Sequence, residues 1–492
     1  MSTLKWENLL SCERRRQSST PVKDKGSRTE IERDFDRILF SAPVRRLADK
    51  TQVFPLEKND SVRTRLTHSH EVANLARSIG THLACSVLEL PSELNSQRNI
   101  PALLAAIGLA HDLGNPPFGH QGETAIQRWV KKNERKLFEL PDNEGSFNCD
   151  ALKADLKKIT PAMRADFLKF DGNAQTFRLL THLQIITDGY GLNLTYATLA
   201  ALLKYTVPSD IAGTTDNKSA KKPGFFQSEA DVVKEVWEHT GLNEGIRHPL
   251  TFIMEACDDI AYSVIDVEDA VKKGLVSFND VIQFLQEVDD DVARKVVENS
   301  RKDFDEHRAY DLSPAELNDV SMQKFRVYAI GAMVGAIFEA FSERQNHLLD
   351  GYFKETLMGV SKAKSICKSL KNFALERAYR HRSVLKIELE GAIVIEGLMD
   401  MLWEAVTNRT NFLQLNDTKE AQSRTDPFAN YVYGRISENY RRAFVAAENL
   451  PIRYREIQLV IDMVSGMTDS YALNLYRELK ALHGRELRAV DA

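Results

Sequence analysis

Four side chains in three separate segments have the types needed to hold one metal ion. They are His68, the adjacent pair His111 and Asp112, and Asp258. Two imidazoles and two carboxylates make a mixed nitrogen and oxygen set, which leaves positions open for water and substrate and suits Mn, Fe, Zn or, less well, Mg. A cation held in this way lowers the pKa of bound water from ~15.7 to ~7 and polarises a phosphoryl oxygen. The set therefore predicts a centre for metal-assisted hydrolytic chemistry.

Helical spacing separates these candidates from their neighbours. His68 falls on the same apolar helix face as Val72, whereas His70 falls on the polar face. In the later segment, Asp258 lies on the apolar face and Asp259 on the polar one. We therefore expect His68 and Asp258 to point into the protein, and His70 and Asp259 to point away from the site.

Each of these residues also has a plainer interpretation. His68 could be a buried, hydrogen-bonded histidine, and His111 with Asp112 could be an ion pair at the end of an apolar helix, where an uncompensated charge is costly. Tyr262 and Asp266 follow the inward aspartate at four-residue steps, so this stripe could present a ring and a hydrogen-bond acceptor to a bound molecule. The alternatives are core packing for Tyr262 and a surface carboxylate for Asp266.

The loop directly after this pair contains two further candidates. Residues 114–123 read Gly-Asn-Pro-Pro-Phe-Gly-His-Gln-Gly-Glu, and the glycines and prolines fix a tight path close to the metal ligands. We expect His120 to lie near bound phosphate as a general acid or base, with Glu123 placed to orient or charge it. The alternative is a turn that carries a surface histidine.

Helical periodicity dominates the chain and predicts an almost all-α protein. Helices are expected over residues 72–83, 103–113, 252–271, 327–341, 387–406 and 454–479. Loops are expected over residues 141–150, 208–227 and 408–427, which are rich in Asn, Asp, Ser, Thr, Gly or Pro. Because the candidate ligands lie on both sides of the first two loops, we expect these loops to be insertions in one folded unit.

Composition disfavours several classes of protein. The 492 residues are 43% hydrophobic, and 65 basic and 70 acidic residues give a formal charge of −5, so no global basic excess indicates nucleic acid or an anionic membrane. The five cysteines are odd in number and far apart, which argues against a disulfide framework or a cysteine zinc site. Residues 1–17 are too polar for a signal peptide, and the longest apolar runs fall short of the ~20 residues of a membrane span. We expect a cytoplasmic protein with no membrane partner.

Several longer motifs, taken in order along the chain, resemble one family. They are Arg65-Leu66-Thr67-His68-Ser69, the segment from His111 to His120, Gly172-Asn173-Ala174-Gln175, Leu203-Lys204-Tyr205, Lys222-Pro223-Gly224-Phe225-Phe226 and Ser465-Gly466-Met467-Thr468-Asp469. The chain is similar over nearly its whole length to the bacterial deoxyguanosinetriphosphate triphosphohydrolases, a family of HD-domain phosphohydrolases.

The resemblance implies a fold, a reaction and partners. The implied fold is an all-α HD-domain core with helical insertions and a C-terminal helical extension. Residues 1–60 would contribute to a nucleotide pocket, residues 61–275 would form the metal-dependent core, and residues 276–492 would complete the pocket and make oligomer contacts. The implied reaction is hydrolysis of dGTP or another dNTP to deoxynucleoside and inorganic tripolyphosphate, by water attack at the α-phosphorus. One divalent metal ion per subunit is implied, Mn or Mg first and Fe, Co or Zn as alternatives. A homo-oligomer, commonly a hexamer, and a single-stranded DNA effector are also implied.

The resemblance also gives each candidate residue a role. The implied metal ligands are His68, His111, Asp112 and Asp258, and the implied catalytic pair is His120 with Glu123. The implied phosphate-binding groups are Lys204, Tyr205 and Lys222, and the implied sugar pocket, closed against C2′ and gripping the 3′-hydroxyl, is formed by Gln52, Tyr262 and Asp266. Base recognition is implied at Glu388, which would face the donor groups of guanine, and at Tyr379, where the family pattern would place Phe.

Two other functions fit part of the same pattern. One is another HD enzyme, such as a 5′-nucleotidase or a phosphodiesterase, and the other is a non-enzymatic nucleotide or single-stranded DNA sensor on the same fold. The phosphate-holding lysines speak against the first, and the intact pair His120 and Glu123 speaks against the second. If DNA binds, local basic clusters such as Arg14 to Arg16 would have to supply the phosphate contacts.

Overall fold

The computed structural model describes residues 3–16, 28–54, 56, 59, 61–139, 149–184, 188–409, 411–415 and 426–490. Within these residues the chain is built from helices joined by turns, and the extended pairing there consists of isolated bridges, such as the one between Arg14 and Thr195. The all-α prediction is confirmed.

The helices of the first half of the chain include those that carry the metal-ligand candidates. They are α1 (Trp6–Leu9), α2 (Glu30–Leu39), α3 (Ala42–Arg46), α4 (Arg65–Ser86), α5 (Ser96–Ala110), α6 (Gly119–Lys132), α7 (Glu134–Phe138), α8 (Cys149–Leu156), α9 (Pro161–Leu168), α10 (Gly172–Arg178), α11 (Tyr196–Leu202), α12 (Ala230–Thr240) and α13 (Pro249–Lys272). A π-helical turn (Leu179–Leu183) extends α10.

The second half adds longer helices. They are α14 (Phe278–Gln286), α15 (Asp291–His307), α16 (Pro314–Leu349), α17 (Leu357–Val360), α18 (Lys364–Ala374), α19 (Arg382–Thr407), α20 (Pro427–Gly434), α21 (Glu438–Ala446), α22 (Ile452–Ser465) and α23 (Asp469–Val490). A second π-helical turn (Leu375–Tyr379) joins α18 to α19.

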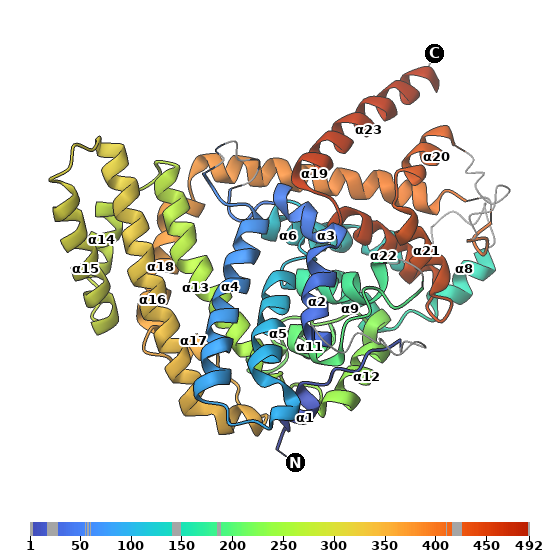
Figure 1. The fold of residues 1–492 in the computed structure, drawn as a ribbon. Helices are drawn as coiled ribbons and strands as arrows, with labels where there is room; N and C mark the ends of the chain where they lie inside the picture. The colour runs from blue at the N-terminus through green and yellow to red at the C-terminus, as the bar shows by residue number, and fades with distance from the viewer. Residues whose placement is uncertain are drawn as a thin grey trace.

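The core lies where α4 and α5 pack side by side and α13 crosses both (Figure 1). The apolar positions that predicted α4 are all inside, with Val72 and Leu83 0% exposed and Ile79 1%. α4 begins at Arg65, where the Thr67 hydroxyl accepts a hydrogen bond from the Thr64 backbone N–H at 3.1 Å and caps the free end. One hydrophobic cluster runs from Leu4 to Leu479, so segments from both ends of the chain share this core.

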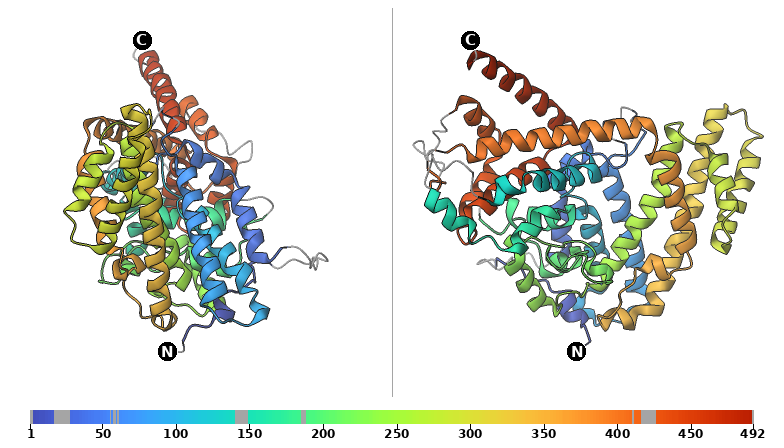
Figure 2. Two further views of the ribbon diagram at one scale, coloured as in Figure 1. Left: turned by 60° about the vertical axis from the view of Figure 1, so that its left-hand side comes forward. Right: turned by 180° about the vertical axis from the view of Figure 1, so that it is seen from behind.

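The second half wraps around the core from two sides. α14, α15 and α16 stack at one end of the molecule, while α19 crosses over α6 and α23 projects away from the body (Figures 1 and 2). α16 is long and apolar enough to cross a membrane by length and composition, but such a single helix is weak evidence. α16 packs against α13 and α15.

Two helix predictions differ from the structure in their boundaries. The helix expected over residues 103–113 begins earlier, at Ser96, and ends at Ala110, so His111 and Asp112 lie in the turn that follows. The single helix expected over residues 454–479 is two helices, because the chain turns at Gly466 and α23 starts anew at Asp469. This break brings Asp469 to the loop that precedes α6.

The predicted loops are described in part. Residues 208–227 lack regular helices except for a short 3₁₀ turn (Lys218–Ala220), and Asp166 of α9 binds both ends of this segment. Most of residues 141–150 and about half of residues 408–427 lie outside the described part of the chain.

Candidate metal and nucleotide site

Three of the four predicted metal ligands converge on one point. The ligand atoms of His68, His111 and Asp258 all lie within 4.8 Å of one another. The Nε2 atom of His68 is 3.3 Å from Asp258 Oδ1, and the Nε2 atom of His111 is 3.6 Å from the same oxygen. As helical spacing predicts, His68 is buried and His70 is exposed. Helices α4 and α13 and the turn after α5 therefore bring the three side chains together.

The chemistry of this donor set fits a divalent cation. The Nδ1 atom of His111 is 2.7 Å from the Gly108 carbonyl, which favours a proton on Nδ1 and leaves Nε2 to bind a cation. That Nε2 atom is buried and has no hydrogen-bond partner within the described residues. Burial disfavours the charged imidazole, but the carboxylates of Asp112 and Asp258 outweigh burial and raise the pKa of His111 to about 8. The site therefore attracts positive charge.

Asp112 lies beside the three-residue cluster. Its Oδ2 atom is 3.5 Å from His111 Nε2 and also pairs with Arg65, while its Oδ1 atom accepts a hydrogen bond from the Asn115 amide at 2.7 Å. Burial raises the pKa of Asp112, but Arg65 and His111 together hold it well below its usual range. Asp112 is thus an ionised carboxylate next to the donors, and its role as a ligand remains a prediction.

His120 and Glu123 form a hydrogen-bonded pair on the first turn of α6. The Nδ1 atom of His120 is 3.0 Å from Glu123 Oε2. The His120 side chain is 77% exposed and faces a cavity, whereas Glu123 is buried. The hydrogen bond to Glu123 raises the pKa of His120. The pair can therefore present a protonated imidazole to a bound molecule.

The turn that delivers His120 has an unusual backbone. Phe118 and Gly119 both have left-handed φ values, +61° and +58° respectively. A bulky residue rarely adopts this conformation, so surrounding contacts must hold it. The Phe118 N–H donates to Asp469 Oδ1 at 3.0 Å, and the Phe118 ring packs so closely on α19 that a Cβ at Gly391 would lie 2.6 Å from it. The start of α23 and the middle of α19 thus fix the path of the loop.

Glu123 connects this pair to a lysine on the 208–227 loop. Its Oε1 atom accepts a hydrogen bond from the Gly172 N–H at 2.8 Å, and its Oε2 atom is 4.0 Å from Lys222 Nζ. Lys222 also pairs with Asp171 Oδ2 at 2.6 Å. Burial lowers the pKa of Lys222, but Asp171 and Glu123 outweigh burial and raise it, which keeps the ammonium group charged. The Lys222 ammonium group therefore lies near the His120 and Glu123 pair.

Lys204 lies next to the metal-ligand cluster. Its Nζ atom is 3.2 Å from Asp258 Oδ2. Burial lowers the pKa of Lys204, but Asp258 raises it by more, so this lysine also stays charged. The neighbouring Tyr205 is buried, and burial raises the pKa of its hydroxyl. The two lysines together provide positive charge next to Asp258 and next to Glu123.

A cavity of about 310 Å³ opens next to His120. Its walls come from all parts of the chain and are formed by Thr51, Gln52, Val53, Phe118, Gly119, His120, Gln121, Tyr262, Leu375, Tyr379, Arg380, Val384, Leu385 and Glu388. The volume falls at the lower end of the range of ~300–1,000 Å³ that is usual for small-molecule sites. The cavity contains four of the five residues predicted to contact sugar and base.

Two of the predicted sugar-pocket residues have a buried acceptor without a partner. The Gln52 Oε1 atom and the Asp266 Oδ1 atom have none within the described residues. Asp266 does not line the cavity but lies behind it, where its Oδ2 atom accepts a hydrogen bond from the Tyr379 hydroxyl at 2.6 Å. Tyr262 stands in front, with its ring 6.0 Å from that of Tyr379. Burial raises the pKa of Asp266 well above its usual value.

The predicted base-binding residues differ in how firmly they are held. Tyr379 is partly buried and tied to Asp266, whereas Glu388 is half-buried on the first part of α19. Burial raises the pKa of Glu388. Leu385, one helical turn before Glu388, is 49% exposed and also lines the cavity. This end of the cavity is therefore a rim that faces solvent.

The sequence interpretation assigned no role to three charged residues at the site. Arg65 pairs with Asp112, and Asp171 holds Lys222. Lys371 of α18 pairs with Asp259 and lies 5.8 Å from the Tyr262 ring centre. Arg65 begins the motif that contains His68, and Asp171 directly precedes the motif that starts at Gly172. Their positions in the sequence could therefore have indicated a role at the site. Nothing in the sequence around Lys371 indicates that α18 packs on α13 at Asp259.

The basic cluster near the N-terminus forms ion pairs within the protein. The Arg14 side chain is only 10% exposed and pairs with Glu30 and Asp34, and Arg15 pairs with Glu235. Arg16 is the exposed member and pairs with Asp188. This cluster therefore fastens the N-terminal segment to the body, and it offers little free positive charge for DNA phosphates.

Comparison with known proteins agrees with this geometry. The HD domain family matches residues 65–163, which include the turn after α5 and His120. A deoxyguanosinetriphosphate triphosphohydrolase-like protein of Listeria innocua is 35% identical over 97% of this chain and 100% of its own length. Proteins named deoxyguanosinetriphosphate triphosphohydrolase are 33% identical in Serratia proteamaculans, over 92% of this chain and 94% of their own length, and 32% identical in Yersinia pestis, over 98% and 100%.

Proposed function

The chain belongs to the HD-domain family of deoxyguanosinetriphosphate triphosphohydrolases and is a nucleotide-hydrolysing enzyme, and we propose that it cleaves dGTP to deoxyguanosine and inorganic tripolyphosphate. The observation that carries the proposal is the adjacency of three groups. These are the His68, His111 and Asp258 cluster, the His120 and Glu123 pair, and the flanking charged lysines.

The metal centre is the first part of the proposed mechanism. His68, His111 and Asp258, with Asp112 beside them, would hold one divalent ion, Mn or Mg first, with Fe, Co and Zn as alternatives. When bound, such an ion supplies an acidified water and polarises a phosphoryl oxygen. The protein orients His111 through Gly108 and keeps both carboxylates ionised through Arg65 and Lys204.

His120 is the proposed general acid. Attack of water on the α-phosphorus forms a new P–O bond and breaks the bond to O5′ of the nucleoside. The leaving O5′ then needs a proton, and the imidazolium of His120 can donate one because Glu123 raises its pKa. The exposed position of His120 in the cavity suits contact with a bound nucleotide. Glu123 acts by orienting and charging the ring.

Lys204, Tyr205 and Lys222 are proposed to hold the triphosphate. The two ammonium groups are compact point charges, which suits phosphate oxygens that must also be released. Lys222 now pairs with Asp171, so a bound phosphate would share or replace that contact. Lys204 lies at the metal-ligand cluster and Lys222 at the His120 and Glu123 pair, and two separate cations suit a polyanion better than a single phosphate.

The sugar and base would occupy the cavity beside His120. We propose that Gln52 and Asp266 accept hydrogen bonds from the sugar hydroxyl, because each has a buried oxygen without a partner within the described residues. We also propose that the Tyr262 ring packs against C2′ and disfavours ribose. Glu388, with Tyr379 nearby, is proposed to accept from the N–H groups of guanine. The preference for dGTP over other dNTPs rests on this rim.

The three chain regions have distinct parts in the proposal. Residues 1–60 supply Gln52, residues 61–275 supply the metal and catalytic groups, and residues 276–492 supply Tyr379 and Glu388. A homo-oligomer is proposed as well, in hexameric form by the family likeness. It is supported by the exposed apolar stripe Leu385, Leu389 and Ile393 on α19. We place the enzyme in the cytoplasm and retain a single-stranded DNA effector only as a test condition.

Product analysis tests the proposal against its rivals. Purified protein with Mn²⁺ or Mg²⁺ is incubated with each of the four dNTPs and with GTP, and the products are resolved by ion-exchange chromatography. Deoxyguanosine with intact tripolyphosphate, formed from dGTP but not from GTP, is the expected result. Release of orthophosphate or pyrophosphate would assign the protein to another phosphohydrolase class. Binding without turnover, with or without single-stranded DNA, would indicate a sensor.

A further inference from the structure

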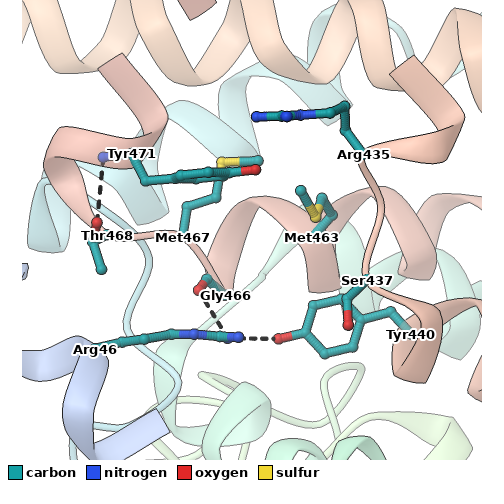
Figure 3. A pocket seen from close by; sticks show the side chains of 9 residues that line it. All are labelled: Arg46, Arg435, Ser437, Tyr440, Met463, Gly466, Met467, Thr468 and Tyr471. Atoms are coloured by element: carbon teal, nitrogen blue, oxygen red, sulfur yellow. Dashed lines mark hydrogen bonds between the residues drawn. The ribbon is translucent and has the colours of Figure 1, made fainter. Parts of the chain in front are cut away.

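A second cavity lies apart from the candidate substrate site. It has a volume of about 300 Å³ and shares none of its lining residues with the cavity beside His120. Arg46 of α3 forms one part of it, and the remaining lining residues come from the segments that join α20 to α23. In the view of Figure 3, Arg435 and Tyr471 lie on one side, Arg46 and Tyr440 on the other, with two methionines between them.

Two guanidinium groups supply the charge of this cavity. Arg46 is half-buried, and the two acceptors that the structure gives it are neutral, the Tyr440 hydroxyl and the Gly466 carbonyl, each at 3.1 Å. Arg435 is 36% exposed, and its nearest carboxylate atom, on Glu478, is 3.8 Å away. Arg435 is therefore in a long ion pair with Glu478, whereas Arg46 pairs with no carboxylate in the described part of the chain. A partly desolvated guanidinium of the second kind favours an anion, and planar guanidinium groups bind phosphate in a bidentate way.

The walls between the arginines suit a flat ring. Met463 and Met467 are 6% and 3% exposed, and their thioethers form an adaptable apolar surface. Tyr471 is 39% exposed at the mouth of the cavity, where a second ring can stack on it. Ser437 adds one hydroxyl group to the lining. An inorganic anion would leave these apolar walls uncovered. A nucleotide with one phosphoryl group would contact the walls through its base and the arginines through its phosphoryl group.

We propose that this second cavity binds one nucleoside phosphate, with the phosphoryl group between Arg46 and Arg435 and the base against Tyr471 and Met467. The cavity holds about one nucleotide by volume, which favours a free mononucleotide over a strand. The site does not depend on the reaction proposed above, because its residues lie outside the candidate catalytic groups.

Photolabelling locates the bound nucleotide without any measurement of turnover. The full-length protein is irradiated with 8-azido-AMP, digested with trypsin and mapped by mass spectrometry. Residues 456–477 form one tryptic peptide that contains Met463, Met467 and Tyr471, and residues 99–128 form the peptide that contains His120. We expect label on peptide 456–477. Label confined to peptide 99–128, or no label, would overturn the proposal.

Variants and competitors test the two halves of the ligand. The double variant Arg435→Gln with Tyr471→Ala is expected to reduce labelling of peptide 456–477 at least tenfold, while Arg442→Gln, an exposed arginine of α21, labels as wild type. Circular dichroism checks that both proteins are folded. On the wild-type protein, which needs no substitution, AMP should compete at least tenfold better than adenosine.

Two competition results would contradict the assignment. Equal competition by adenosine and AMP would show that the arginines do not bind the phosphoryl group. A 5′-phosphorylated single-stranded oligonucleotide that competes more tightly than AMP would assign the site to the end of a nucleic acid. Unchanged labelling in the folded double variant would show that Arg435 and Tyr471 are not the contacts.

Discussion

The two ends of the candidate active site are built in different ways. At the metal end, His68 and His111 are buried, and each ionisable group there has a charged or hydrogen-bonded neighbour. At the base end, Leu385 is 49% exposed and Glu388 is half-buried on the solvent side of α19. Burial and paired charges hold the side chains of the metal end in one arrangement, so this end is suited to a single type of reaction. The second end is an open rim, where we expect a change of side chain to alter which nucleotide fits.

The largest expected effect is at the metal end. His111→Ala removes one of three converging donors and should lower kcat for every dNTP by about 10³-fold or more, because a bound metal supplies several kcal/mol of transition-state stabilisation. Bound Mn²⁺, measured by isothermal titration calorimetry, should be lost in parallel. His70→Ala is the control, because His70 is an exposed histidine of α4 that lies outside the three-donor cluster. Full Mn²⁺ binding by the His111 variant would show that the cluster is not a metal site.

His120→Ala should separate chemistry from metal binding. Loss of a general acid lowers kcat by about 10²–10⁴-fold. Because His120 is not part of the three-donor cluster, Mn²⁺ binding should be unchanged. Thr124→Ala, on the next turn of α6, is the control. A variant that keeps wild-type kcat would remove His120 from the mechanism.

The pH profile should respond to Glu123→Gln. The hydrogen bond from His120 to Glu123 raises the pKa of His120, so the imidazolium persists to higher pH in the wild type. Activity that needs this imidazolium is present at lower pH and is lost as the pH rises through the pKa of His120. In Glu123→Gln the alkaline limb of kcat should move to lower pH. A limb that stays in place or moves upward would contradict the assignment of His120 as the acid.

Lys222→Ala should weaken substrate binding more than chemistry. A charged hydrogen bond contributes about 1.5–3 kcal/mol, which corresponds to a rise of roughly 10- to 100-fold in KM for dGTP. The exposed neighbour Lys221→Ala is the matched control. Initial-rate kinetics with Mn²⁺ held constant provide the measurement, and an unchanged KM would exclude a phosphate contact at Lys222.

The smallest effect is expected at the rim. Glu388→Gln keeps the shape of the side chain and exchanges one acceptor for a donor, so the ratio of kcat/KM for dGTP and dATP should fall by about two- to tenfold. Metal binding should be unchanged. Glu390→Gln, two residues further along α19 and exposed, is the control. If Glu388→Gln instead abolished turnover of all dNTPs, the contrast between the two ends would be wrong.

The same contrast explains what could be predicted from the sequence. Helical spacing placed His68 on the buried face of α4 correctly. It did not separate Asp258 from Asp259 by burial, because their side chains are 23% and 28% exposed, but only Asp258 joins the three-donor cluster.

Helical spacing failed at two turns, the break at Gly466 and the end of α5 at Ala110. The Gly466 carbonyl accepts a hydrogen bond from Arg46, and the Gly114 N–H in the turn after α5 donates to Thr176, so distant segments contact both turns. The fold class and the three-donor cluster followed from periodicity and motif order.

Residues that act through tertiary packing were not predictable in this way. Lys371 meets Asp259 only because α18 packs on α13, and Asp469 holds Phe118 only because α23 restarts beside the catalytic loop. Asp266 accepts a hydrogen bond from Tyr379 and does not line the cavity, and its role in the sugar pocket stays a prediction. The roles given to individual site residues stay predictions until they are tested by substitution.

Hydrolysis of dGTP in H₂¹⁸O tests the central claim most directly. If water attacks the α-phosphorus, one ¹⁸O atom enters the tripolyphosphate product, and the 5′-hydroxyl of deoxyguanosine carries none. Mass spectrometry of both products distinguishes the oxygen atoms. ¹⁸O in orthophosphate, in pyrophosphate or in the 5′-hydroxyl would contradict the account, because the bond broken would then not be the one between the α-phosphorus and O5′.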